Sequence, residues 1–231
     1  ALTAWVMTGR ALRPVQLSIE RQRRFVADAA HELQTPLASV RTDLEVALAH
    51  PASTTWDSTA RDVLGANERM TTLVRDLLVL ARSDGANTLP PRAVELGDVV
   101  REELAHVTST ALDASIDDVA VSGRRDDLAR VVRNLVDNAV RHAATRVSVT
   151  LSSDGSDAVL VVADDGPGVP VAERDRVFER FVRLDEDRGR STGGTGLGLA
   201  IVRELVAAHG GTVTIDGAAG AEFCVRLPRP V

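Results

Sequence analysis

The 231-residue sequence contains one cysteine, no lysine and no apolar run of 18 residues. The single cysteine, Cys224, excludes an internal disulfide bond and is compatible with a reducing compartment. Without a long apolar run, no complete membrane span is present. The net charge of −6 argues against a general nucleic-acid-binding protein, so we expect no nucleic-acid partner.

The charged residues divide the chain into two unlike parts. Residues 1–85 carry ten arginines and ten acidic residues, whereas residues 86–231 carry 17 arginines and 23 acidic residues. A chain of this length accommodates one large domain or two small ones, and the uneven charge favours two. We predict an N-terminal segment over 1–13, a helical domain over 14–85, a linker over 86–94 and a mixed domain over 95–231.

The first nine residues are mostly apolar and precede Arg10 and Arg13. This pattern is typical of the end of a membrane-spanning helix with a basic cytoplasmic flank. A frayed terminal segment of a soluble protein is the alternative.

Apolar residues alternate four and three positions apart in the first part, which predicts a helix over Pro14–Ala49 with a heptad seam. The seam consists of Val26, Ala30, Leu33, Leu37, Val40, Leu44 and Ala47. His31 falls outside it, so we predict that its imidazole faces solvent, with Glu32 beside it and Thr35 one turn further on. Because Pro36 cannot donate to the carbonyl of Glu32, we expect the helix to bend there.

A second helix is predicted over Asp57–Arg82, after the loop His50–Trp56. Its seam consists of Val63, Ala66, Met70, Leu73, Leu77 and Leu80. The two helices are expected to form an antiparallel hairpin. One hairpin leaves one side of each seam bare, so we predict that a second copy completes a four-helix bundle. A monomeric hairpin packed on its own C-terminal domain is the alternative.

The second part alternates between helical and strand patterns, after a linker rich in glycine, proline and small polar residues. We predict helices over 96–112, 126–142 and 197–209, and strands over 119–121, 147–151, 159–164, 212–216 and 222–227. Helices segregated from a largely antiparallel sheet define an α+β sandwich.

Asn134 and Asn138 are four residues apart on one face of a predicted helix, and Arg141 follows one turn later. Side-chain amide oxygens are neutral ligands that suit Mg²⁺, which then keeps its charge for a phosphate. Taken alone, two asparagines at this spacing are also compatible with an ordinary polar surface.

The sequence Asp164-Asp-Gly-Pro-Gly168 directly follows a predicted strand. A carboxylate at the end of a strand suits hydrogen bonding to the amino edge of a purine, and Gly166 and Gly168 allow a flat ligand to approach the backbone. A simple Asp-Gly turn is the alternative.

The glycine-rich sequence Gly193-Gly-Thr-Gly-Leu-Gly198 opens a predicted helix, where free N–H groups favour an anion. It follows no strand, so it is not a dinucleotide fingerprint, and it lacks the Gly-Lys-Ser/Thr ending of a P-loop. We predict a mobile lid that ends on a phosphate-binding helix. Upstream, Phe178 and Phe181 are predicted to anchor the lid, and Arg180 and Arg183 to bring positive charge to a γ-phosphate.

These motifs, in this order, resemble those of the sensor histidine kinases of two-component systems. The resemblance covers about residues 14–228 and includes five boxes of that family. They are the H box at 31–37, the N box at 134–139, the first glycine box at 164–168, the F box at 178–181 and the second glycine box at 194–198.

The resemblance implies a dimeric four-helix bundle, formed by the dimerisation and histidine phosphotransfer domain, followed by an α/β sandwich ATP-binding domain of the Bergerat (GHKL) type. It implies that His31 is autophosphorylated from ATP, with Glu32 as acid–base or orienting partner. The phosphoryl group then passes to an aspartate of a response-regulator receiver domain, and Thr35 positions water for the regulator's dephosphorylation.

The same resemblance implies an ATP site in which Asn138 is the Mg²⁺ ligand, Asn134 and Arg141 lie by the phosphates and Asp164 reads the adenine amino group. The remaining nucleotide-binding residues are expected to be Gly166, Gly168, Arg183, Gly194, Thr195, Gly196, Leu197 and Gly198. It further implies that residues 1–13 are the end of a transmembrane segment and a connector. The chain would then be the cytoplasmic portion of a cell (inner) membrane sensor kinase, with most of its membrane anchor outside this sequence.

Two residues depart from the family pattern. Gln34 stands where Arg, Lys or Ser is frequent, which places the contacts with the regulator and the phosphatase activity in question. Arg124 stands where Asp is common, with an expected effect on local helix capping.

Two other functions fit the sequence less well. ATPases of the same superfold activate water with a glutamate one turn before the metal-binding asparagine, and here that position is Asn134, a far weaker base. A nucleotide-binding scaffold without activity would lack catalytic residues, and none is missing. We therefore predict an ATP-dependent protein-histidine kinase.

Overall fold

The computed structural model describes residues 2–51, 55–83, 92–108, 111–184, 195–217 and 220–230, with the backbone alone for residues 2–25 and 82–83. The chain divides into two compact units, Ala1–Leu77 and Leu78–Val231, and the boundary falls within a helix. In the part of the chain described, no helix is both long and apolar enough to cross a membrane.

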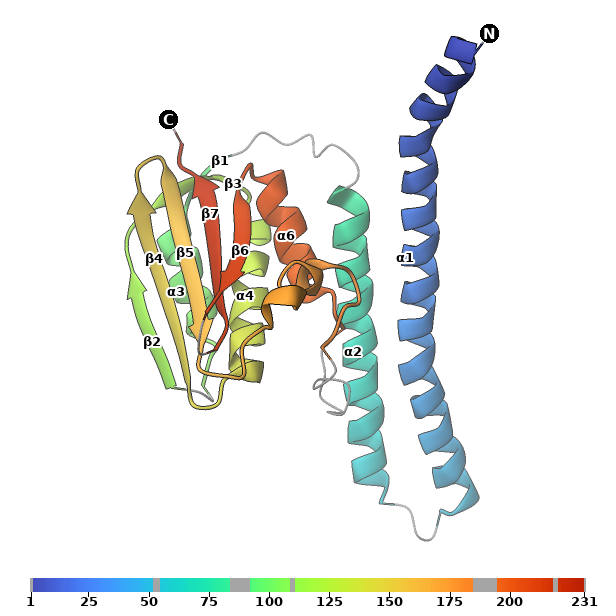
Figure 1. Cartoon of the computed structure of the whole chain (residues 1–231). Coiled ribbons are helices and arrows are strands. Elements are labelled where there is room, and N and C mark those ends of the chain that lie inside the picture. Colours follow the sequence, from blue (N-terminus) through green and yellow to red (C-terminus); the bar gives the residue numbers. More distant parts are fainter. Residues whose placement is uncertain are drawn as a thin grey trace. The chain divides into compact units, whose positions relative to one another are not determined.

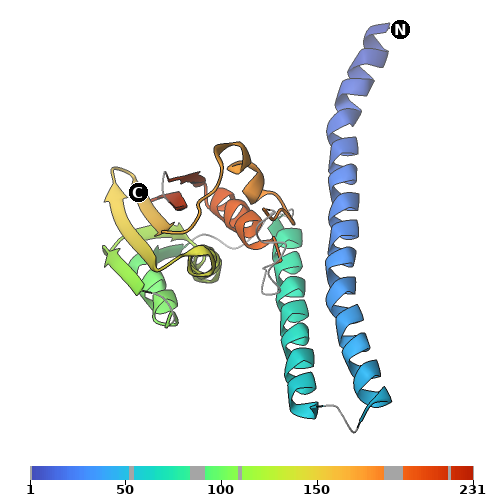
Figure 2. The ribbon, with the colours of Figure 1, turned by 60° about the horizontal axis from the view of Figure 1, so that its bottom comes forward.

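The first unit is a hairpin of two long helices, α1 (Leu2–Ala49) and α2 (Trp56–Ser83), which run side by side in both views (Figure 1, Figure 2). The predicted hairpin is confirmed. The predicted start of the first helix at Pro14 is wrong, because α1 is already helical from Leu2. Both Pro14 and Pro36 are accommodated within one continuous helix, since a proline removes only a single backbone donor and the surrounding residues favour helix.

The two predicted seams differ in burial. On α2 every seam residue is buried or half-buried, as expected. On α1 the seam splits into two stripes. Leu33 and Val40 are half-buried and Ala47 is buried, whereas Leu37 and Leu44 remain 59% and 39% exposed. The first stripe is covered from Leu33 to Ala47 but not at Val26, which is 61% exposed, and the second stripe is exposed apolar surface along α1.

The second unit is built on a five-stranded sheet with the strand order β2-β4-β5-β7-β6. The strands are β2 (Ala111–Ile116), β4 (Arg146–Asp154), β5 (Asp157–Asp164), β6 (Thr212–Asp216) and β7 (Glu222–Pro228). Only β2 and β4 pair in parallel, so the sheet is largely antiparallel, as predicted. The helices α3 (Leu96–Leu104), α4 (Arg125–His142) and α6 (Gly198–Ala208) cover one face (Figure 1).

Alternation of side chains along the strands explains this layering. On β4, Val147, Val149 and Leu151 are fully buried, while the residues between them are half-buried or exposed. The apolar side of α4 packs against this inner face, and its buried residues are Leu128, Val131, Val132, Leu135, Val136 and Ala139. The core therefore lies between the sheet and α4, and the opposite side of α4 is left for a site.

Two strands were not predicted. The helix expected over 96–112 ends at Leu104, and residues 111–116 form β2, because parallel pairing with β4 satisfies a segment that has no regular apolar alternation of its own. Residues 92–94, within the predicted linker, belong to β1 (Arg92–Glu95), which pairs antiparallel with β3 (Ala120–Gly123). Two short 3₁₀ helices, η1 (Val171–Glu173) and η2 (Arg176–Phe178), follow β5.

Candidate phosphoacceptor helix and nucleotide site

His31 lies on α1 with its side chain exposed, as predicted, and Glu32 beside it is half-buried. The hydroxyl of Thr35 donates a hydrogen bond of 3.3 Å to the carbonyl oxygen of His31. Because Pro36 has no N–H, the carbonyl of Glu32 lacks its usual helical donor. The Thr35 hydroxyl thus adds a hydrogen bond at the carbonyl of His31, one residue before the carbonyl that lacks its donor. The Thr35 oxygen can still accept a hydrogen bond from solvent.

Asp164, the last residue of β5, is buried with 6% exposure. Its Oδ1 atom accepts hydrogen bonds from the backbone N–H groups of Gly166 at 2.9 Å and Ala221 at 3.4 Å. Its Oδ2 atom is also buried but has no hydrogen-bond partner among the described residues. A buried carboxylate oxygen without a donor is costly, so this atom is suited to accept from the amino group of a ligand.

The glycines near Asp164 allow backbone to pack against backbone. A Cβ atom on Gly166 would lie 2.1 Å from the carbonyl oxygen of His142, and one on Gly220 would lie 1.8 Å from that of Asp164. Gly168 has φ of +73°, and its Cβ would lie 2.7 Å from the oxygen of Gly220. On the side that a Cβ atom would take, both glycines therefore lie against the protein's own backbone, and their predicted contact with a ligand stays a prediction. Gly220 lies between two predicted strands and was not predicted to belong to the site.

Asn134 lies on α4 and is half-buried, and its Nδ2 atom is buried without a hydrogen-bond partner in the described part of the chain. The first residue of α6, Gly198, lies next to it, since a Cβ on Gly198 would be 3.4 Å from Asn134 Oδ1. Asn138 is half-buried and Arg141 is exposed, one and two turns further along the same helix. Asn134 thus offers a free donor beside the start of a second helix.

The N-cap residue of α6 is Leu197, and no described side chain caps this end of the helix. The Leu197 side chain is fully buried, so only its backbone is available to a ligand. Its N–H donates to the Thr195 hydroxyl at 3.4 Å. Uncapped N–H groups in a first turn attract anions. Gly193 and Gly194 lie outside the described residues.

The predicted anchors Phe178 and Phe181 differ. Phe178 is 5% exposed and meets Phe223 edge to face, with ring centroids 6.2 Å apart, so it anchors this segment in the core as predicted. Phe181 is half-buried and has φ of +62°, a conformation that non-glycine residues rarely adopt. Its N–H donates to the Gly196 carbonyl at 2.9 Å. Arg183 is half-buried. The strained Phe181 backbone therefore joins the F box to the second glycine box.

In the sequence, Asp165 stands out only as the second residue of the Asp164–Gly168 motif. In the structure, its carboxylate organises the loop after α4. Its Oδ1 atom accepts from the N–H groups of Ala144, Thr145 and Arg146 at 2.9 to 3.0 Å, and Oδ2 accepts from the Thr145 hydroxyl. These bonds hold the pKa of Asp165 well below its usual range. The end of α4 and the end of β5 are thereby tied together beside Asp164.

Asp137 is the carboxylate nearest in sequence to the two asparagines. It lines a separate cavity of about 320 Å³ between α3 and α4, together with Glu103, His106 and Arg133. Arg133 donates two hydrogen bonds to the buried Glu103 carboxylate, at 2.8 and 2.9 Å. Asp137 therefore belongs to the α3 side of α4.

The chain thus combines a long helical hairpin with a sandwich of helices on a five-stranded sheet, and both parts match known families. Residues 21–86 match the family model described as the His Kinase A (phospho-acceptor) domain. Residues 123–231 match the one described as histidine kinase-, DNA gyrase B-, and HSP90-like ATPase.

Sequence relatives agree with both matches. The chain is 42% identical over 229 residues to the probable sensor histidine kinase TcrY of Mycobacterium tuberculosis, covering 94% of this chain and 48% of that protein. It is 42% identical over 219 residues to the signal transduction histidine-protein kinase/phosphatase MprB of Mycolicibacterium smegmatis, covering 89% and 44%. The chain spans about half the length of these curated relatives.

Among solved structures, a mycobacterial sensor histidine kinase MprB is 35% identical, with a TM-score of 0.54 over 61% of this chain and 99% of that one. Full-length ShkA in complex with AMPPNP is 30% identical, with a TM-score of 0.64 over 76% of this chain and 39% of that one. The chain belongs to the sensor histidine kinases of two-component systems.

Proposed function

We propose that this chain is the kinase core of a two-component sensor, which transfers the γ-phosphoryl group of ATP to His31 and then to an aspartate of a response-regulator receiver domain. The observation that carries the proposal is a pair of buried, unpartnered polar atoms in the second unit, an acceptor on Asp164 and a donor on Asn134. The first unit supplies an exposed histidine as the acceptor of the phosphoryl group.

The two unpartnered atoms match the two ends of ATP. Asp164 Oδ2 accepts from the adenine amino group, and Asn134 Nδ2 donates to a phosphate oxygen. We assign Arg141, Arg183 and the first turn of α6 to the phosphates, with Gly194, Thr195, Gly196, Leu197 and Gly198 forming the turn that leads into α6. The relative ShkA was solved with AMPPNP, which supports a nucleotide at this fold's site.

Asn138 is the residue that we assign to Mg²⁺. Its amide offers a neutral oxygen, and its position one turn from Asn134 places it on the phosphate side of α4. When bound there, Mg²⁺ supplies charge neutralisation for the triphosphate. The Nδ2 atom of Asn134 is a buried donor without a partner in the described part of the chain, so we assign Asn134 to a phosphate and Asn138 to the metal.

In the transfer step, an unprotonated imidazole nitrogen of His31 attacks the γ-phosphorus, and the bond between that phosphorus and the β,γ-bridging oxygen breaks to leave ADP. Glu32 takes the proton that the other ring nitrogen loses. No carboxylate occupies the Asn134 position, and Asp137 faces the α3 side, so the site lacks a strong base to activate water. ATP is therefore retained for His31 instead of being hydrolysed.

Incubation of the chain with γ-labelled ATP and Mg²⁺ tests this function, and acid-labile, base-stable labelling is the expected result. Replacement of Asn138 by Ala is expected to reduce that labelling by at least about 100-fold, because the metal loses a ligand. Asn67→Ala, which changes an exposed asparagine on α2, is the matched control and retains labelling. Equal labelling of both variants would place the metal elsewhere.

We further propose that the exposed stripe of Leu37 and Leu44 on α1 mediates homodimerisation. These side chains are apolar, exposed and in register with the buried seam of the same helix. Replacing both by Glu is expected to raise the dimer dissociation constant by about 10³-fold or more, since each buried leucine contributes about 1.5–3 kcal/mol.

Sedimentation of the double variant measures this effect, and circular dichroism checks that the helices persist. Val171→Glu, at a still more exposed apolar residue of the second unit, is the control and stays dimeric. A double variant that sediments as a dimer at the wild-type dissociation constant contradicts the assignment.

We also propose the domain limits given above, residues 14–85 for the dimerisation and phosphotransfer domain and 95–231 for the ATP-binding domain. We place the chain on the cytoplasmic side of a cell membrane, anchored through an N-terminal segment. Thr35 serves the regulator phosphatase reaction, and the neighbouring Gln34 adjusts the balance between kinase and phosphatase.

A further inference from the structure

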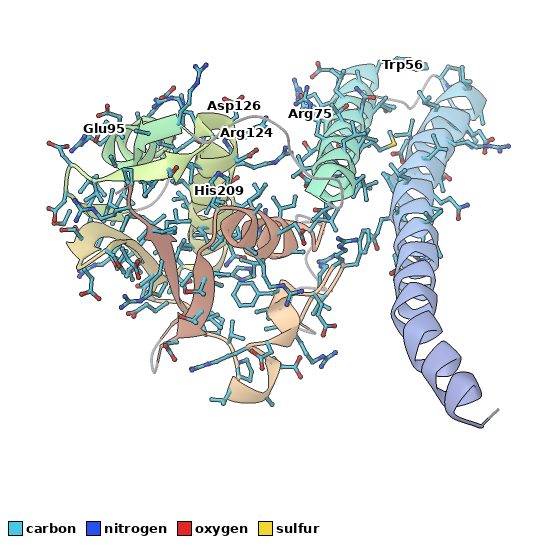
Figure 3. All side chains as sticks on the ribbon, turned by 90° about the horizontal axis from the view of Figure 1, so that it is seen from above. Trp56, Arg75, Glu95, Arg124, Asp126 and His209 are labelled. Carbon is cyan, nitrogen blue, oxygen red and sulfur yellow. The ribbon has the colours of Figure 1, made fainter. Side chains whose placement is uncertain are left out.

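The helix α4, which carries Asn134 and Asn138, begins without a side-chain cap from any residue that the structure describes. Its N-cap residue is Arg124, whose guanidinium lies 3.4 Å from the Asp127 carboxylate and has no acceptor to offer the backbone. Instead, the Arg124 N–H donates to Nε2 of His209 at 3.2 Å. His209 is the C-cap residue of α6, and Figure 3 labels both residues where these helix ends meet.

The two hydrogen bonds of His209 determine its tautomer. Nδ1 lies 2.7 Å from the Leu205 carbonyl oxygen, which only accepts, so Nδ1 carries the hydrogen. Nε2 receives the Arg124 N–H and must therefore be unprotonated. Only the neutral Nδ1–H imidazole makes both bonds at once, which links the end of α6 to the start of α4.

Gly123 provides the space for this ring. A Cβ atom on Gly123 would lie 2.4 Å from Cδ2 and 2.8 Å from Nε2 of His209. The imidazole therefore packs directly on the backbone at the end of β3, and any larger residue at 123 would displace it. The same contact holds the ring in line with the Arg124 N–H.

The link lies at one end of an antiparallel helix pair whose other end is the proposed phosphate site. Asn134 is next to Gly198 at that end, and Arg124 bonds His209 at the opposite end. Ten residues of α4 separate the two contacts, or about 15 Å of helix. Buried side chains such as Leu128, Ile201 and Leu205 fill the space around both helices. A slide or rotation at the His209 end therefore moves Asn134 relative to the first turn of α6.

We propose that His209 is a positioning residue for ATP binding, which sets the register between α4 and α6 and so the spacing between Asn134 and the N-terminus of α6. This inference rests on the proposed ATP site. His209 touches neither ATP nor His31 in this scheme; it acts through the two helices that meet the phosphates.

Substitutions of His209 separate its two hydrogen bonds. His209→Asn can reach only the Leu205 carbonyl, whereas the longer side chain of His209→Gln places a carbonyl oxygen where Nε2 accepts from Arg124. We expect the dissociation constant for ATP of the full chain to rise about five- to tenfold in His209→Asn and to stay within about twofold in His209→Gln. Both are measured well below the melting temperature of each variant.

Gly123→Ala reaches the same link from the other side. It is expected to weaken ATP binding as His209→Asn does, because the new Cβ displaces the ring. In a His209→Ala background, Gly123→Ala is expected to have no further effect, since no ring remains to be displaced. A residue that only stabilised the fold would instead lower the melting temperature and leave the ATP affinity unchanged.

Nitrogen-15 spectra of the histidine side chains provide a test without substitution. The expected signature for His209 is a protonated Nδ1 and an unprotonated Nε2, and the Arg124 amide resonance shifts in His209→Asn but not in His209→Gln. A protonated Nε2, or equal ATP affinity of the wild type, Asn and Gln variants, overturns the inference and leaves the proposed function standing. A wild-type chain that binds no ATP overturns both.

Discussion

Replacement of His31 by Gln is expected to abolish the acid-labile labelling of the chain by γ-labelled ATP, while the affinity for ATP stays unchanged. The amide nitrogen of glutamine shares its lone pair with the carbonyl and is no nucleophile. The side chain at 31 is exposed, so the substitution removes no packing. Filter-bound label after base treatment measures the first quantity, and titration with a fluorescent ATP analogue measures the second.

His50→Gln is the matched control, because it changes another exposed histidine at the far end of α1. It is expected to retain wild-type labelling. The sequence holds five histidines, so the acceptor assignment is exclusive only if the other four, at positions 50, 106, 142 and 209, do not carry the label. Wild-type labelling of the His31→Gln variant would show that another residue accepts the phosphoryl group.

Replacement of Asp164 by Asn is expected to weaken ATP binding by about 10²- to 10³-fold. The N–H groups of Gly166 and Ala221 both require an oxygen at the Oδ1 position, so the asparagine amide is held with its NH₂ at the position of Oδ2. That NH₂ then meets the adenine amino group donor to donor. The backbone bonds that support the loop persist, so the fold is expected to remain intact.

For the same substitution, we predict the opposite effect on the relative affinity for GTP. Guanine presents a carbonyl oxygen where adenine presents an amino group, so the ratio of GTP affinity to ATP affinity is expected to rise in Asp164→Asn. Asp157→Asn, at the other end of the same strand, is the control and leaves both affinities unchanged. Unchanged ATP affinity in the Asp164 variant would mean that the base lies elsewhere.

Periodicity was sufficient to predict the elements that bury an apolar face. The helix α4 and the strands β4, β5, β6 and β7 lie where their apolar spacing placed them, within a few residues. The strand β2 was missed, and the predicted helix ran two residues into it, because only Leu112 and Ile116 are even half-buried and the segment shows no apolar alternation. Its conformation comes from the hydrogen bonds of β4, a partner more than thirty residues away.

For the site, the sequence predicted the groups that would meet a ligand, and the structure adds the groups that hold them. Asp164 and Asn134 were predicted from motif and spacing. Ala221, which donates to Asp164, and His209, which bonds the start of α4, were missed because these contacts join segments 57 and 85 residues apart. No local sequence pattern marks the Ala221 N–H as a donor or the His209 imidazole as an acceptor.

The support of Asp164 by Ala221 also sets an order of events during synthesis. The strand β5 acquires its second neighbour only when β7 is made, and Gly220 packs on the Asp164 carbonyl at the same time. A nascent chain, which folds from its N-terminus, therefore presents His31 on a completed hairpin before Asp164, the carboxylate that we propose reads the base, is in place. The same holds for a chain cut short within β6, which would keep the proposed acceptor histidine but lose the support of the carboxylate proposed to bind adenine.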